Sequence, residues 1–489
     1  MTRKEPSVGA NARWLGAAQV VKALVQLVGI GILSRLLGPA DFGMMALATV
    51  VTSLAGLLRD MGTGPAIIRA RTLDHSLVDA IFWLNLTVAT VVALIVVATA
   101  IPLARAFDAA PLAHLLYGLA VTFPIMSFGA AHQALLERES RFRITARADV
   151  VSYTSGMIAA IVAAHAGLGA LSLVLQAIVQ ACLSSVQLFL ASPWRPSFKC
   201  DTAQLKRIFA FSSNLTLSNL LMYLQRNSDS IIVGRLLGAR ALGPYSLAFR
   251  IMLYPLQNVS LVASKSLYPV LAMQQSEPQR LAATWLSSTS FVGLLTATLM
   301  GGLMALRVPF VAVALGPRWE EVGQLLLWLA PVGFVQSVLS TAPAAFMVKG
   351  RTGSLLWINF GNTAVHIACW LVGSHWGLQG IAAGYLVATL TTAPFYLACI
   401  AHLLALKRMA LLRAVGAPIL LGAGVFLCSF AMDSLLADTA ELPPLARLVI
   451  AGAVGALYGL WHLSRFHPTQ CGSLLRTLRL RVPRGEPTL

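Results

Sequence analysis

Long apolar segments alternate with short polar connections from one end of the chain to the other. Each segment has about 20 residues, enough for an α-helix to cross the roughly 30 Å hydrocarbon core of a bilayer. There are fourteen of them, at residues 13–35, 43–60, 78–103, 112–134, 148–166, 168–190, 208–233, 243–264, 284–306, 322–347, 353–373, 378–404, 411–433 and 445–464. The connections are too short for a soluble domain. The pattern therefore predicts an all-α polytopic membrane protein.

Composition supports this interpretation. Hydrophobic residues make up 57% of the 489 residues and charged residues only 11%, with a mean hydropathy of +0.76. A soluble domain has about 25% charged residues. The net charge of +18 could indicate a nucleic-acid partner, but the basic residues lie in gaps between apolar segments instead of on a face of a soluble fold. We therefore predict that the protein lies among membrane lipids and does not bind nucleic acid.

The basic residues also predict an orientation. With the N-terminus inside, 26 Lys and Arg fall in cytoplasmic connections and seven on the opposite side. The seven are Arg35, Arg105, Arg235, Arg240, Arg307, Arg318 and Arg447. Such an asymmetry follows the positive-inside rule. We expect both termini in the cytoplasm and an even number of spans.

The chain contains an internal repeat. Residues 32–48 read ILSRLLGPADFGMMALA, and residues 232–248 read IVGRLLGARALGPYSLA, with eight of seventeen positions matching at an offset of 200. The offset spans six predicted helices, so both copies enter the membrane in the same direction. This arrangement predicts two parallel six-helix lobes, residues 1–200 and 201–405, followed by a helix pair and a basic tail at 406–489.

Four glycines of the repeat have predicted structural roles. Gly38 and Gly238 are expected in tight turns between antiparallel helices, since glycine tolerates backbone conformations that other residues avoid. Gly43 and Gly243 are expected to permit close contact between helices.

Polar side chains occur where hydrocarbon is expected. Such groups normally face a bundle interior or a water-filled cavity. On the segment 208–233 they gather on one helical face, and under the offset of 200 Gln19 corresponds to Asn219 and Gln26 to Arg226. We predict that these faces line a central cavity. The predicted cavity residues are Gln19, Lys22, Gln26, Asn219, Tyr223, Arg226, Asp229, Arg250 and Asn362.

Three of these residues, two positive and one negative, are predicted at similar depth in the membrane. Arg226 and Arg250 lie about 10 Å inside their segments, and Asp229 is one turn from Arg226. They could form a cluster with one net positive charge, suited to an anionic ligand, or a buried ion network that fixes helix packing. For Lys22 the alternative to ligand contact is a snorkelling or packing role.

Motifs for catalysis and nucleotide hydrolysis are absent from the sequence. There is no Walker A loop, GxSxG, HExxH or pair of carboxylates with catalytic spacing. The six cysteines show no metal-ligand spacing. We therefore expect neither an enzyme nor a cofactor. Two sources of direction for transport stay open: coupling to H⁺ or Na⁺, and consumption of the transported substrate by a later reaction.

Three stretches of the chain resemble the polysaccharide flippases of the MOP (multidrug/oligosaccharidyl-lipid/polysaccharide) superfamily, of the Wzx or colanic-acid-exporter type. They are residues 32–48, given above; residues 218–260, SNLLMYLQRNSDSIIVGRLLGARALGPYSLAFRIMLYPLQNVS; and residues 314–333, ALGPRWEEVGQLLLWLAPVG. The stretch 218–260 is similar to the family signature R-N-x-D…G-R-x-L-G…L-G-x-Y-x-L-A-x-R…P. The residues that match it by position are Arg226, Asp229, Arg235, Tyr245 and Arg250.

The resemblance implies a MATE-like membrane fold and a flippase of the bacterial inner membrane. Its substrate would be an undecaprenyl-diphosphate-linked oligosaccharide, moved from the cytoplasmic to the periplasmic leaflet for exopolysaccharide, capsule or O-antigen synthesis. A polysaccharide polymerase and its co-polymerase would be partners.

Three other functions compete with this one. A multidrug or small-molecule exporter of the same superfamily is disfavoured for cationic drugs, because the predicted cavity holds three cations and one carboxylate. A membrane-embedded glycan polymerase or ligase would be expected to have a large outer loop, and the predicted outer loops are short. A scaffold without transport would have no need of the polar faces.

Overall fold

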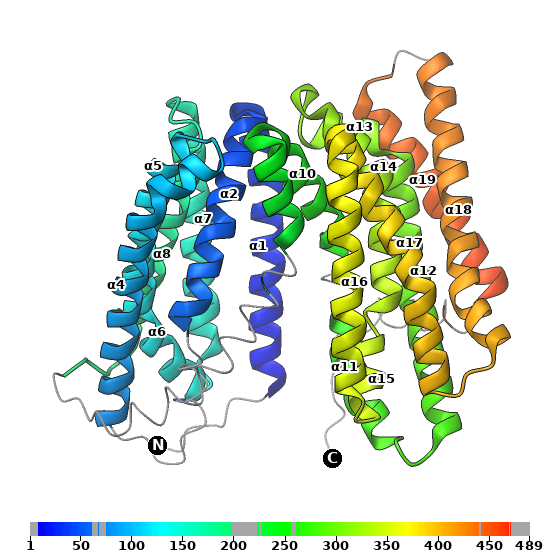
Figure 1. The fold of residues 1–489 in the computed structure, drawn as a ribbon, viewed down its shortest axis with the longest axis horizontal. Coiled ribbons are helices and arrows are strands. Elements are labelled where there is room, and N and C mark those ends of the chain that lie inside the picture. Colours follow the sequence, from blue (N-terminus) through cyan, green and yellow to red (C-terminus); the bar gives the residue numbers. More distant parts are fainter. Residues whose placement is uncertain are drawn as a thin grey trace, which may run out of the picture. The chain divides into compact units, whose positions relative to one another are not determined.

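The fold is all-helical in the part of the chain that the structure describes (Figure 1). This computed structural model describes residues 8–60, 67, 75–197, 223, 227–255, 261–439, 442–468 and 470. Within them, eleven helical stretches are long and apolar enough to cross a membrane. One of these, Thr352–Leu403 with 52 residues, contains the predicted span 353–373 and all but the last residue of the predicted span 378–404. The prediction of a multi-pass helical membrane protein is confirmed. The count of fourteen stays a prediction, since the segment 208–233 lies largely outside the described residues.

The chain divides into two compact units, residues 1–246 and 247–489. This boundary falls inside one helix, so the three-part division inferred from the repeat remains a prediction. The first unit contains α1 (Val8–Leu36), α2 (Pro39–Asp60), α4 (His75–Ala106), α5 (Pro111–Ala120), α6 (Thr122–Arg138), α7 (Phe142–His165) and α8 (Leu171–Ala191). Residues 227–236 are also helical, and α10 (Gly238–Pro255) begins in this unit and ends in the next.

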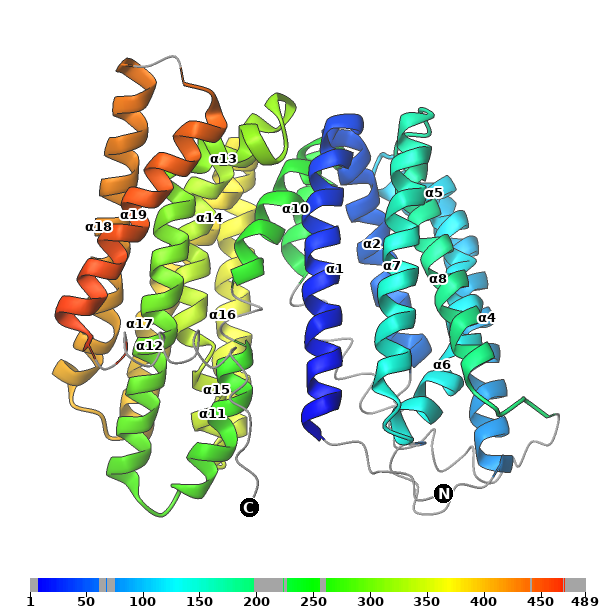
Figure 2. The same cartoon turned by 180° about the vertical axis from the view of Figure 1, so that it is seen from behind.

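Helices of the first unit pack against neighbours both adjacent and distant in the sequence. Helix α7 packs against α8 and α1, and α6 packs against α8 and α4 (Figure 2). The α7–α8 connection turns sharply because Gly167 and Gly169 both have positive φ, at 83° and 55°, values that glycine adopts without a Cβ clash. This turn makes α7 and α8 antiparallel neighbours.

A cluster of aromatic side chains packs in the core of the first unit. Phe82 on α4 packs edge-on against Phe128 and Trp194. Next to this core, the backbone of Ser197 accepts a hydrogen bond from Trp83 Nε1 at 2.8 Å, and the side chain of Ser197 donates to the buried Asp79. These contacts fold the chain after α8 back onto α4.

The second unit contains the remaining helices. They are α11 (Leu261–Met273), α12 (Pro278–Ala305), α13 (Arg307–Ala314), η2 (Pro317–Trp319), α14 (Glu320–Leu339), α15 (Ala342–Val348), α16 (Thr352–Gly373), η3 (Ser374–Trp376), α17 (Gly377–Leu403), α18 (Arg408–Thr439) and α19 (Pro444–Phe466). Helix α12 packs against α14 and α18, and α17 packs against α14 and α16.

Glycines let α18 approach α12 closely, and an ion pair joins α18 to α19. A side chain at Gly301 on α12 would overlap the carbonyl oxygen of Gly422 on α18, so the two backbones approach closely. Arg447 on α19 binds Asp433 on α18 with Nη2 2.9 Å from the carboxylate oxygen. Both side chains are largely buried, and the pair fixes the α18–α19 hairpin.

Candidate functional site

The two copies of the repeat meet inside the first unit. A Cβ added to Gly43 on α2 would overlap the carbonyl oxygen of Ala239, and one added to Gly243 on α10 would overlap that of Pro39. The offset of 200 converts each contact into the other. The predicted close helix contact at Gly43 and Gly243 is therefore confirmed, and its two halves are related by the repeat.

The turn glycines of the repeat differ from each other. Gly238, the first residue of α10, has φ of +82° and follows the turn after residues 227–236, as predicted. Gly38 is not among the glycines with positive φ, and its amide donates to Asp41 Oδ2 at 2.9 Å. The Asp41 side chain therefore caps the first turn of α2. At Gly238, by contrast, the chain turns through a residue with positive φ.

Asp229 is a buried carboxylate with a tyrosine partner. Its side chain is 2% exposed and accepts hydrogen bonds from Tyr245 Oη at 2.9 Å and from the backbone amide of Ser230 at 2.7 Å. Tyr245 on α10 is fully buried. Buried carboxylates require such donors, because an unpaired charge in a low dielectric is costly. The bond ties residues 227–236 to α10.

The structure describes only part of the predicted cluster of Asp229 with Arg226 and Arg250. In that part of the chain Asp229 makes no ion pair, and its partners are the tyrosine hydroxyl and a backbone amide. The side chain of Arg250 is exposed on α10. Arg226 lies outside the described residues, so its pairing stays a prediction.

The other predicted cavity residues of the first unit have different environments. Tyr223 donates from its hydroxyl to the backbone carbonyl of Val50 on α2 at 3.1 Å. On α1, Gln19 is exposed and Gln26 is half-buried. Asn219 lies outside the described residues.

Lys22 on α1 has an acidic partner that the sequence did not reveal. Its Nζ lies 3.5 Å from Asp149 Oδ2 on α7 and 5.9 Å from the ring centre of Tyr153. Asp149 comes seven residues after the start of α7, about 10 Å along the helix. The predicted segment 148–166 instead begins one residue before Asp149, next to a basic connection, which would leave the carboxylate at the membrane edge. The signal that could have found it is the i, i+4 spacing with Tyr153 on one face.

Asn362 lies beside a hydrogen-bonded network in the second unit. The backbone oxygen of Asn362 is 2.8 Å from His366 Nδ1, and His366 Nε2 is 3.2 Å from Thr389 Oγ1. Gln336 Nε2 donates to Tyr385 Oη at 2.9 Å, and the His366 ring packs edge-on against Tyr385. This network joins α14, α16 and α17, and it gives His366 a packing role. The amide of Asn362 itself is half-buried.

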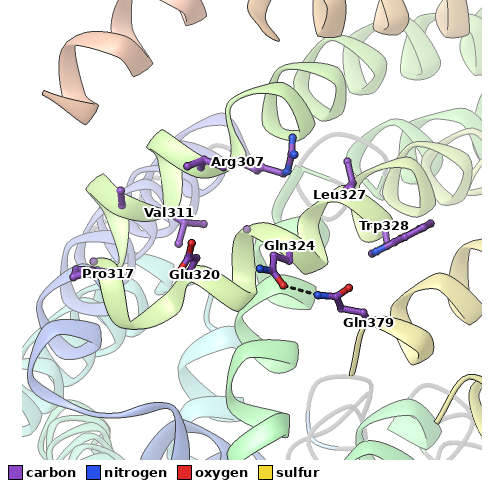
Figure 3. Close-up of a pocket in the computed structure, with 12 residues that line it drawn as sticks. Arg307, Val311, Pro317, Glu320, Gln324, Leu327, Trp328 and Gln379 are labelled. Carbon is purple, nitrogen blue, oxygen red and sulfur yellow. Dashed lines mark hydrogen bonds between the residues drawn. The ribbon is translucent and has the colours of Figure 1, made fainter. Parts of the chain in front are cut away.

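A pocket that the sequence did not indicate lies between α13, α14 and α17 (Figure 3), and we call it the polar pocket for the four polar side chains in its otherwise apolar lining. Its volume is about 590 Å³, and its polar lining residues are Arg307, Glu320, Gln324 and Gln379. A second cavity of about 630 Å³, lined mainly by apolar residues of α16 and α17, shares Trp328 and Gln379 with it. Part of the polar lining belongs to the stretch 314–333, which carried a resemblance but no predicted site.

Sequence comparisons find relatives that match most of the chain. The lipopolysaccharide biosynthesis protein WzxC of Escherichia coli (strain K12) is 25% identical over 390 residues, which cover 79% of each chain. The succinoglycan biosynthesis transport protein ExoT of Rhizobium meliloti (strain 1021) is 27% identical over 351 residues, which cover 72% of this chain and 71% of ExoT.

Two solved structures share the architecture. The lipid II flippase MurJ in an inward closed conformation superposes with a TM-score of 0.72 at 10% identity, covering 93% of this chain and 99% of MurJ. An inward-facing multidrug resistance MATE family transporter of the MOP superfamily has a TM-score of 0.56 at 18% identity, covering 78% of this chain and 95% of the transporter. At these identities the likeness establishes the fold. The family model described as polysaccharide biosynthesis protein matches residues 32–324, more than half of the sequence, and the chain therefore belongs to that family.

Proposed function

We propose that this protein is a flippase that transfers an undecaprenyl-diphosphate-linked oligosaccharide from the cytoplasmic to the periplasmic leaflet of the bacterial inner membrane. The observation that carries the proposal is the family match over residues 32–324, which includes both copies of the repeat. Relatives named for lipopolysaccharide and succinoglycan biosynthesis, one of them a transport protein, support it. The MurJ-like fold is compatible with such a substrate.

The proposed topology has fourteen spans in two parallel six-helix lobes plus a C-terminal pair, with both termini cytoplasmic. The loop charges support this orientation. In this scheme the lobes alternate access to a polar cavity between them. The sugar head would pass through the cavity while the isoprenoid chain stays in lipid.

Within the cavity we assign the diphosphate to the cations Lys22, Arg226 and Arg250. Guanidinium groups bind phosphate oxygens in a bidentate geometry. The uncharged cavity residues would hydrogen-bond the sugars. They are Gln19, Gln26, Asn219, Tyr223 and Asn362.

The bond between Asp229 and Tyr245 supports a positioning role for the carboxylate. Asp229 anchors α10, the helix that carries Arg250, through a buried hydroxyl. We therefore propose that Asp229 holds Arg250 at the depth where the diphosphate enters. The proposal also includes coupling of transport to H⁺ or Na⁺, and interaction of the protein with a polysaccharide polymerase and its co-polymerase.

The rival function with structural support is a small-molecule exporter, because the MATE transporter shares the fold. The charges of the proposed cavity favour an anionic substrate over cationic drugs. Relatives described by polysaccharide biosynthesis also favour a transporter over a polymerase or ligase.

A complementation experiment tests the substrate-binding assignment. In a strain that depends on this protein for polymer export, Arg250→Ala should abolish export while the protein stays abundant in the membrane. Arg240→Ala is the matched control, since Arg240 is also an exposed arginine of α10 but lies outside the predicted cavity. Normal export by Arg250→Ala would remove Arg250 from the binding site.

A further inference from the structure

Two adjoining cavities in the second unit differ in chemistry. The polar pocket and the apolar cavity meet at Trp328 on α14 and Gln379 on α17. One continuous surface therefore passes from charged and amide groups to hydrocarbon. A ligand that fills both must be an amphiphile.

The polar pocket offers one positive and one negative group. Arg307 donates from Nη1 to the carbonyl oxygen of Met304 at 2.9 Å, which leaves its other N–H groups without a partner among the described residues. Glu320 is exposed and has no ion pair within that part of the chain. The formal charge of the pocket is therefore zero, with the two signs on different elements, α13 and α14.

Two amide side chains stand between these charges and the apolar cavity. Gln379 Nε2 donates to Gln324 Oε1 and so fixes both side chains (Figure 3). The Gln324 amide nitrogen then remains as a donor, and the Gln379 oxygen as an acceptor. The pocket can thus satisfy a ligand that has both acceptor oxygens and donor N–H groups.

The apolar cavity has the form of a groove along α17. From Gln379 to Val387 it extends eight residues, about 12 Å along the helix axis. Gly380 and Gly384 form part of its floor, where the absence of side chains brings α16 close. Val387 is 57% exposed. The groove is therefore open along its side, as expected for a surface that meets lipid chains.

We infer that these cavities bind one zwitterionic phospholipid of the phosphatidylethanolamine class. Arg307 would take the phosphate and Glu320 the ammonium group, each through a charge-assisted hydrogen bond. One acyl chain would lie in the groove against Trp328. A purely anionic head, such as a diphosphate or phosphatidylglycerol, would leave Glu320 unpaired beside its own charge.

This site shares no lining residue with the proposed transport cavity, and its occupancy does not rest on the proposed function. On the proposed topology it lies at the periplasmic interface. Trp376, which lines the groove and is 72% exposed, suits that position, since tryptophan is enriched at membrane interfaces.

Native mass spectrometry of the purified, delipidated full chain tests the inference. Phosphatidylethanolamine, phosphatidylglycerol with the same acyl chains, and undecaprenyl diphosphate are titrated separately. We expect the first phosphatidylethanolamine to bind at least about tenfold more tightly than phosphatidylglycerol, the effect of one charged hydrogen bond. Glu320→Gln should abolish this preference.

Two further variants separate the site from general effects. Glu321→Gln is the matched control, because Glu321 is the exposed neighbour of Glu320 on α14 and does not line the pocket. It should keep the preference. Ala383→Trp fills the groove without changing a charge and should weaken binding of both phospholipids.

Equal binding of the two phospholipids by the unaltered chain would overturn the inference. The same would follow if Glu321→Gln lost the preference as Glu320→Gln does, or if Ala383→Trp bound both phospholipids normally. Displacement of phosphatidylethanolamine by undecaprenyl diphosphate, with sensitivity to Glu320→Gln, would assign the pocket to the transported lipid instead.

Discussion

Gly43 and Gly243 each occupy a position where only a hydrogen atom fits beneath the backbone of the other's helix. The carbonyl of Ala239 lies over Gly43, and that of Pro39 lies over Gly243. Adding 200 to the numbers of Pro39 and Gly43 gives Ala239 and Gly243, so the repeat relates the two contacts to each other. The repeat thus has a physical reason, because α2 and α10 approach each other through equivalent surfaces.

The glycine contact predicts a strong effect of a single methyl group. Gly43→Ala or Gly243→Ala must displace a backbone carbonyl, so we expect each to destabilise the protein by about 1–3 kcal/mol or more, the cost of overpacking. The melting temperature of the detergent-purified protein measures this. Gly56→Ala on the same helix is the control, since nothing lies within 4 Å of a Cβ there. Equal melting temperatures for all three variants would show that α2 and α10 do not touch as described.

Removal of the Tyr245 hydroxyl should destabilise the protein, because the buried Asp229 loses a hydrogen bond. Tyr245→Phe leaves a carboxylate that is 2% exposed without its side-chain donor, at a cost of about 1–3 kcal/mol. Tyr268→Phe, at a 43% exposed tyrosine, should be neutral. In a double-mutant cycle, Asp229→Asn combined with Tyr245→Phe should be less destabilising than the sum of the single changes. Strict additivity would contradict the bond.

Much of the fold can be predicted from sequence, because hydropathy and loop charge are local properties. The helical class and the close approach at Gly43 and Gly243 follow from the residues themselves. The partners of polar groups do not. The sequence places Asp229 beside arginines, but its described partners are Tyr245, sixteen residues away, and a backbone amide. Such pairings depend on how helices rotate about their axes, and composition does not encode that rotation.

Asp149 and the polar pocket escape prediction for related reasons. The predicted segment 148–166 puts Asp149 at the edge of the membrane, whereas the helix begins at Phe142 and carries the carboxylate to Lys22. The pocket unites α13, α14 and α17, whose polar residues are separated by up to 72 positions from Arg307 to Gln379. No spacing rule joins residues so far apart.

The ion pair between Lys22 and Asp149 allows a test of whether Lys22 binds substrate. If it does, Lys22→Met should abolish polymer export, whereas Asp149→Asn should retain it, because the ammonium group remains available. If the pair serves packing alone, both variants should lose export equally. The exchange of both residues, Lys22→Asp with Asp149→Lys, should then restore it. Export by each variant in the dependent strain, with protein abundance measured alongside, separates these results.

The proposed topology predicts the location of six sites. Reporter fusions at Arg141, Lys199, Lys407 and Arg479 should report the cytoplasm, and fusions at Asp108 and Asp438 the periplasm. The excess of basic residues in the cytoplasmic connections is the physical reason. Two adjacent sites on the wrong side would contradict the count of fourteen.

The central claim, transfer of a lipid-linked oligosaccharide between leaflets, is tested most directly in reconstituted vesicles. An undecaprenyl-diphosphate oligosaccharide is placed in both leaflets, and a glycosidase added outside cleaves only the sugars that face it. With the protein present, cleavage should proceed beyond the outer half of the substrate and approach completion, and Arg250→Ala should reduce it to the protein-free level. Cleavage that stops at the outer half in every case, while the same vesicles transport a cationic dye, would contradict a flippase and support an exporter.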